Sequence, residues 1–257
     1  RRLRSGLGAL APLLPPGAGE LPVAAVQHLA RALGPARDWD VFVESTLAPL
    51  MAQFPEHYGL RELERACARL RKSAQCAADR AVASPGYQRL VLSIGRWLTE
   101  EPWGGQTTPE QVLALQAPAI GHARAVLDRG YRRMRKRGRG LVRLDSSQLH
   151  RLRIAAKKLR YAAGFFAPLF SSPRVRPMLE ALNDLQDVLG AINDGATAQA
   201  LIKAAVRDSG EPLRRQARDI VRDWTARAFE HHRQALTRSW KAFRGCEQFW
   251  CSTRMLT

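Results

Sequence analysis

Apolar residues recur every three or four positions along most of the chain, which is the spacing of a helix with one buried face. Residues 63–70 and 179–189 both show this pattern, and no stretch alternates apolar and polar positions for long enough to predict a strand. The longest apolar run, residues 161–170, is too short to cross a bilayer. The pattern predicts an all-α protein with about nine or ten helices joined by short links.

Clusters of proline and glycine predict where these helices end. The predicted breaks lie at residues 15–17, 34–35, 84–86, 102–105, 138–140, 171–173, 195 and 210–212. Thr108 and Ser172 each precede a proline, so both are predicted to cap a helix whose first turn carries that proline. Asp38 and Asp40 follow the break at 34–35, and we expect them to cap that helix start or to orient a basic side chain on a neighbouring helix.

The two halves of the chain resemble each other at an offset of 156 residues. This shift places Arg1–Arg4 over Lys157–Arg160 and Ala11–Leu14 over Ala167–Phe170, and the match continues without a gap to Asp38 over Asp194. Self-similarity of this kind indicates a repeated structural unit. We therefore predict two related, pseudo-symmetric helical bundles, residues 1–143 and residues 144–257.

The charge of the chain is strongly one-sided. It has 41 Lys and Arg residues against 23 Asp and Glu residues, a formal net charge of +18. Residues 1–143 hold 22 basic and 12 acidic residues, and the remainder holds 19 and 11, so both halves are basic. Such a balance favours a polyanionic partner: nucleic acid, an anionic membrane surface or polyphosphate. Arginine dominates, and its planar fork suits bidentate contact with phosphate oxygens.

One predicted helix, residues 149–161, gathers cations on a single face. At 100° per residue, Leu152, Ala155 and Leu159 share the side suited to packing. The opposite side and its edges carry His150, Arg153, Lys157, Lys158, Arg160 and Tyr161. Like charges in a row repel one another, and a ligand with repeating phosphates would relieve that repulsion. The repeat gives Arg1, Arg2 and Arg4 equivalent places, and the basic run 131–139 adds Arg132, Arg133 and Lys136.

Two motifs resemble those of the CHAD family, the conserved histidine α-helical domains. The run His150-x-x-Arg153-x-x-x-Lys157-Lys158-Leu159-Arg160-Tyr161 resembles the family signature, and Gly34-Pro35-Ala36-Arg37-Asp38-Trp39-Asp40-Val41 resembles its second marker. The resemblance implies two four-helix repeats around a basic groove or channel. It also implies binding of inorganic polyphosphate, often at cytoplasmic polyphosphate granules, and in some members fusion to a triphosphatase-type domain.

Some positions depart from the family pattern. Gly164 stands where the family has an acidic residue, and Asn193-Asp194 replaces the Arg-Asp pair of the second repeat. The histidine of the first repeat would precede Arg1, so the first repeat is expected to be truncated at its start. The predicted polyphosphate-binding residues are Arg1, Arg2, Arg4, Arg37, Arg132, Arg133, Lys136, His150, Arg153, Lys157, Lys158, Arg160 and Tyr161.

Motifs for catalysis are missing from the sequence. It contains no glycine-rich phosphate loop, no nucleophile motif and no paired carboxylates for magnesium, so we expect a binding protein without catalytic residues, cofactor or metal. The four cysteines are expected to be reduced thiols in a cytoplasm. Two alternatives stay open: a nucleic-acid-binding helical protein and, with less support, a histidine-dependent phosphate-handling enzyme. A membrane partner is not expected.

Overall fold

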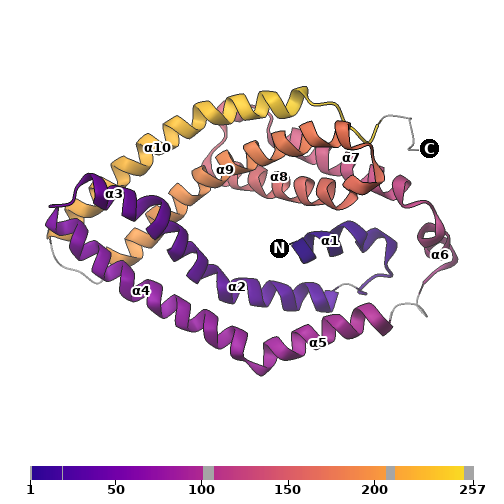
Figure 1. Ribbon diagram of the computed structural model, residues 1–257, viewed down its shortest axis with the longest axis horizontal. Coiled ribbons are helices and arrows are strands. Elements are labelled where there is room, and N and C mark those ends of the chain that lie inside the picture. The colour runs from indigo at the N-terminus through magenta and orange to yellow at the C-terminus, as the bar shows by residue number, and fades with distance from the viewer. Residues whose placement is uncertain (1, 19, 101–106, 207–211, 252–257) are drawn as a thin grey trace. The chain divides into compact units, whose positions relative to one another are not determined.

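The computed structural model describes residues 2–18, 20–100, 107–206 and 212–251, and within these ranges it contains helices and no strand (Figure 1). The all-α prediction is therefore confirmed. The helices are α1 (Arg2–Leu10), α2 (Glu20–Phe42), α3 (Ala48–Gln53), α4 (Tyr58–Ala83), α5 (Pro85–Glu100), α6 (Pro109–Gln116), α7 (Ala119–Arg137), α8 (Ser146–Phe166), α9 (Ser172–Val206) and α10 (Pro212–Gly245). Short 3₁₀ turns at Ala11–Leu13, Leu141–Arg143 and Ala167–Leu169 and a π-helical turn at Val43–Leu47 complete the list.

The chain forms two compact units. The first unit comprises Arg1–Val26, Leu90–Leu189 and Ala235–Thr257, and the second unit comprises Gln27–Arg89 and Gly190–Gln234. Each unit takes segments from both halves of the sequence. Helices α2, α5, α9 and α10 are each divided between the two units. The division into repeats at residues 1–143 and 144–257 stays a prediction. One local feature agrees with it: the 3₁₀ turns at Ala11–Leu13 and Ala167–Leu169 lie 156 residues apart.

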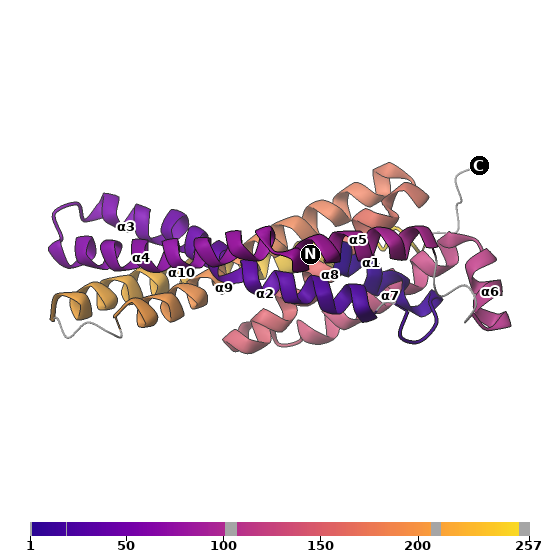
Figure 2. The ribbon, with the colours of Figure 1, turned by 90° about the horizontal axis from the view of Figure 1, so that it is seen from below.

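The first unit is built around α8, which contacts both α7 and α1 (Figures 1 and 2). The helical spacing of Leu127, Tyr131 and Met134 explains why one side of α7 is buried. The Tyr131 ring lies 5.4 Å from that of Phe243 and 5.8 Å from that of Trp250, centroid to centroid. These contacts tie α7 to the end of α10, and burial of each large side chain stabilises the unit by about 1.5–3 kcal/mol.

The second unit has a core of its own. It combines aromatic residues at the end of α2 with leucines of α4 and small or branched residues of α9 and α10. Its buried members are Trp39, Phe42, Leu47, Leu50, Leu60, Leu63, Ala66, Cys67, Ala198, Ile202, Ala205, Ala217 and Val221. Burial raises the pKa of the Cys67 thiol to about 12, so this cysteine behaves as an apolar core residue.

Most of the predicted helix ends within the described residues are confirmed, at 15–17, 84–86, 138–140 and 171–173. Thr108 caps α6 as expected, and it forms a reciprocal capping box with Gln111. The breaks at 34–35 and 195 are wrong, because α2 continues through Pro35 and α9 continues through Gly195. Residues 102–105, 210 and 211 lie outside the described ranges.

Candidate anion-binding site

An antiparallel pair, α7 and α8, positions the site. Gly130 lies so close to Leu159 that a Cβ at residue 130 would be 3.1 Å from Cδ1 of the leucine. Further along, Nη1 of Arg137 donates a hydrogen bond of 2.9 Å to the carbonyl oxygen of Arg151. These two contacts fix the register of the pair. In this register the arginines at the end of α7 lie beside the basic part of α8.

Lys158 stands among arginines from two other helices. Its side chain is exposed, yet neighbouring protein displaces part of its water, and this desolvation together with Arg133, Arg4 and Arg137 lowers the pKa of Lys158. The charged groups that shift this pKa are all arginines. We call Arg4, Arg133, Arg137 and Lys158 the Lys158 cluster; α1, α7 and α8 supply its members, all within the first unit. An anion bound there would relieve their mutual repulsion.

Arg160 lies one half-turn further along α8 and is held in place by α9. Its Nε donates to Oε1 of Gln186 at 2.7 Å, and its Nη1 donates to Oδ1 of Asn183 at 3.3 Å. Its Cζ also lies 4.6 Å from the centroid of the Tyr161 ring. Because the amide partners are neutral, they orient the guanidinium without cancelling its charge.

Comparison with known proteins identifies the family of this chain. The model of the CHAD domain family matches residues 1–203. The chain belongs to the CHAD domain family. The family is associated with polyphosphate binding. A search of curated proteins finds no match.

Two solved structures share the fold. The crystal structure of the CHAD domain from the plant Ricinus communis is 28% identical, and the match covers 96% of this chain and 79% of that one with a TM-score of 0.77. PptA from Streptomyces chartreusis is 16% identical, and the match covers 94% of this chain and 86% of that one with a TM-score of 0.73. The second likeness supports the fold alone.

The CHAD signature residues of α8 do not share one exposed face. His150 and Lys158 are exposed, and Lys157 and Tyr161 are half-buried. Arg153 is only 8% exposed, so the expectation that it lies on the open basic face is wrong. Packing explains the difference: α8 contacts α7 and α1, and α9 reaches it through Arg160, so more than one side of this helix is covered.

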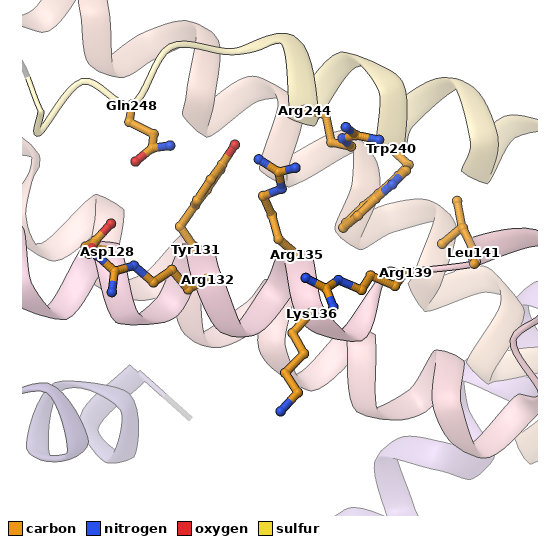
Figure 3. A pocket seen from close by; sticks show the side chains of 12 residues that line it. Asp128, Tyr131, Arg132, Arg135, Lys136, Arg139, Leu141, Trp240, Arg244 and Gln248 are labelled. Carbon is orange, nitrogen blue, oxygen red and sulfur yellow. Dashed lines mark ion pairs between the residues drawn. The ribbon is translucent and has the colours of Figure 1, made fainter.

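The predicted residues of α7 divide between two faces. Arg133 belongs to the Lys158 cluster, whereas Arg132 and Lys136 line a pocket between α7 and the end of α10 (Figure 3). Arg137 was missed from the prediction, although its position one helical turn after Arg133 was a usable signal. The sequence does not show which face of α7 is buried, so it could not be used to predict which arginines of the run 131–139 lie together.

The remaining predicted residues lie apart from the cluster or outside the description. Arg2 is exposed on α1, and Arg1 is outside the described residues. Arg37 belongs to the second unit, where its Nη1 lies 3.1 Å from Oδ1 of Asp38. Whether these residues contact a ligand stays a prediction.

The aspartates of the second CHAD marker do not cap a helix, because both lie inside α2. Asp40 instead links α2 to α4: its Oδ1 accepts from Nε of Arg71 at 2.7 Å and from Nε2 of Gln75 at 3.0 Å. The alternative expectation, a carboxylate that orients an arginine on a neighbouring helix, therefore describes this geometry.

The described residues contain neither a cluster of metal ligands nor a membrane-spanning helix. Within residues 2–18, 20–100, 107–206 and 212–251, no three His, Cys, Asp or Glu side chains gather as metal ligands would. No helix in the same ranges is long and apolar enough to span a bilayer.

Proposed function

We propose that the chain binds inorganic polyphosphate through the Lys158 cluster and the adjoining residues of α8. The observation that carries this proposal is the convergence of Arg4 of α1 and of Arg133 and Arg137 of α7 on Lys158 of α8, where desolvation and these three arginines lower the pKa of the lysine. Like charges held together by a fold destabilise it unless an anion is bound nearby. Membership of the CHAD family supports the choice of anion.

A polyphosphate chain suits this surface because its charge repeats along its length. Arginine forks contact two oxygens of one phosphate, and the ammonium group of Lys158 acts as a point charge. His150 and Arg160 lie about 15 Å apart along the axis of α8, so a chain that follows the helix passes several cations. Each contact releases condensed counterions, which supplies much of the binding free energy.

Nucleic acid fits the same surface less well. Sequence-tolerant binding of single strands uses aromatic rings on which bases stack. Tyr161 is the aromatic residue of the α8 basic stripe, and the guanidinium of Arg160 already covers its ring at 4.6 Å. We therefore propose that the protein prefers polyphosphate to DNA and RNA. We also propose that it cleaves no phosphoanhydride bond and that it associates with polyphosphate granules.

The decisive experiment compares two triple variants in binding long-chain polyphosphate, with DNA as competitor. Arg133→Ala/Arg137→Ala/Lys158→Ala removes three charges of the cluster, and we expect its affinity to fall about a hundredfold because charge-assisted contacts are lost. The matched control, Arg69→Ala/Lys72→Ala/Arg80→Ala, removes three exposed charges of α4 in the second unit. We expect the control to stay within about threefold of the parent.

Each outcome has a definite meaning once circular dichroism shows that both variants are folded. Equal losses in the two variants would show a diffuse basic surface and contradict the proposed site. Displacement of polyphosphate by DNA at equal phosphate concentration would favour the nucleic-acid alternative. Release of orthophosphate that is lost in His150→Ala would contradict the proposal of a binding module.

A further inference from the structure

A second basic site lies on another face of α7. A pocket of about 880 Å³ opens between the end of α7, the turn that follows it and the end of α10, all within the first unit (Figure 3). Arg135 lines it and stands two residues beyond Arg133, about 200° around α7, and Arg139 lines it from the turn that follows the helix. The pocket and the Lys158 cluster therefore face different directions from α7.

The pocket concentrates positive charge. Arg132, Arg135, Lys136, Arg139 and Arg244 line it against a single carboxylate, Asp128, which pairs with Arg132 at 2.6 Å. Within the part of the chain that the structure describes, the other four cations form no ion pair. Figure 3 shows Arg135 extending from α7 toward the part of α10 that carries Arg244. Lys136 extends away from α10, so the charges available to an anion in the pocket are those of Arg135, Arg139 and Arg244.

Apolar side chains form part of the pocket wall. The Trp240 ring packs on Gly138 so closely that a Cβ there would lie 2.2 Å from Cη2, and Leu141 and Tyr131 add further apolar surface. The amide of Gln248 and the hydroxyl of Tyr131 lie at one end of the pocket (Figure 3). An inorganic chain gains nothing from apolar walls, whereas a phosphate ester with a ring buries that ring against them.

We propose that this pocket binds a nucleoside polyphosphate. The guanidinium groups of Arg135, Arg139 and Arg244 offset most of the charge of about −4 that a nucleoside triphosphate carries near neutral pH, because each internal phosphate bears one charge and the terminal one nearly two. The apolar walls take the base and ribose, and the amide of Gln248 supplies a donor and an acceptor for the edge of a base. The volume lies within the usual range for small-molecule sites.

Calorimetry with ATP, inorganic tripolyphosphate and adenosine as separate titrants tests the assignment. We expect ATP to bind about tenfold more tightly than tripolyphosphate, because only ATP also buries a ring, and adenosine to bind most weakly. Arg135→Ala/Arg244→Ala should weaken ATP binding about tenfold or more, because two guanidinium contacts are lost. The control Arg69→Ala/Lys72→Ala loses the same charge from α4 and should retain ATP binding.

The two proposals fail separately. Arg133→Ala/Arg137→Ala/Lys158→Ala should keep its ATP affinity although it loses polyphosphate, and Arg135→Ala/Arg244→Ala should do the reverse. Equal affinities for ATP and tripolyphosphate would overturn the assignment of a nucleoside ligand. An ATP affinity that falls equally in the pocket variant and the α4 control would overturn the pocket as the site.

Discussion

At the scale of single residues, charge and burial decide which cations a ligand can reach. The sequence placed Lys158 at the edge of the basic stripe and Arg153 at its centre, but the structure reverses their access to solvent. A helical projection assumes one buried side, and α8 is packed on more than one. The motif identified the helix that carries Lys158, whereas the partners of Lys158 required knowledge of which helices lie beside it.

The pKa of Lys158 reports on this environment. We predict that Arg133→Ala/Arg137→Ala raises it toward its ordinary value of 10.5, because two of the cations that lower it are removed. The folded-state pKa lies below the unfolded value, so between the two the unfolded chain binds more protons and stability rises with pH. Titration of ¹³C-methylated lysines by NMR measures the pKa, with Lys158→Arg to assign the signal. An unchanged pKa in the double variant would show that Arg133 and Arg137 do not act on Lys158.

At the scale of helices, apolar periodicity predicted the elements well and proline and glycine predicted their ends less well. Helix α2 passes through Gly34-Pro35 and keeps Trp39 and Phe42 buried beyond it. Helix α9 likewise passes Gly195 and buries Ala198 and Ile202. Tertiary packing of the apolar residues beyond each break outweighs the local cost of one lost hydrogen bond or one flexible residue. Local propensity could not reveal that compensation.

The contact of α7 with α10 depends on a glycine. In Gly138→Ala the new Cβ would lie 2.2–2.9 Å from three carbons of the Trp240 ring, and a rigid ring cannot yield as a flexible side chain does. We predict a loss of stability of about 1–3 kcal/mol, the usual cost of overpacking. Urea denaturation measures it.

The control for this prediction is Gly121→Ala in α7, the helix that ends just before Gly138. Nothing lies within 4 Å of a Cβ at that position, so the substitution should be neutral or stabilising by about 0.5–1 kcal/mol. Gly138→Ala and Gly121→Ala with the same urea midpoint would contradict the role assigned to the Gly138–Trp240 contact.

At the scale of the whole molecule, net charge and local contacts act on a polyanion in different ways. The formal charge of +18 attracts any polyanion over a distance set by ionic strength. The sequence alone was enough to predict that attraction and the all-α class, because both follow from composition and periodicity. The sequence alone could not show that Arg4 and Arg137, which are distant from Lys158 in the chain, are its neighbours in space, because that depends on how the helices pack.

Salt dependence separates these two contributions. The logarithm of the polyphosphate affinity should fall linearly with the logarithm of salt concentration, with a slope proportional to the phosphates neutralised. Arg133→Ala/Arg137→Ala/Lys158→Ala should reduce that slope by about two to three, whereas Arg69→Ala/Lys72→Ala/Arg80→Ala has the same net charge and should leave it nearly unchanged. Binding measured by fluorescence anisotropy across a salt series gives both slopes. Parallel lines for the two variants would mean that net charge alone governs binding and that the Lys158 cluster makes no direct phosphate contacts.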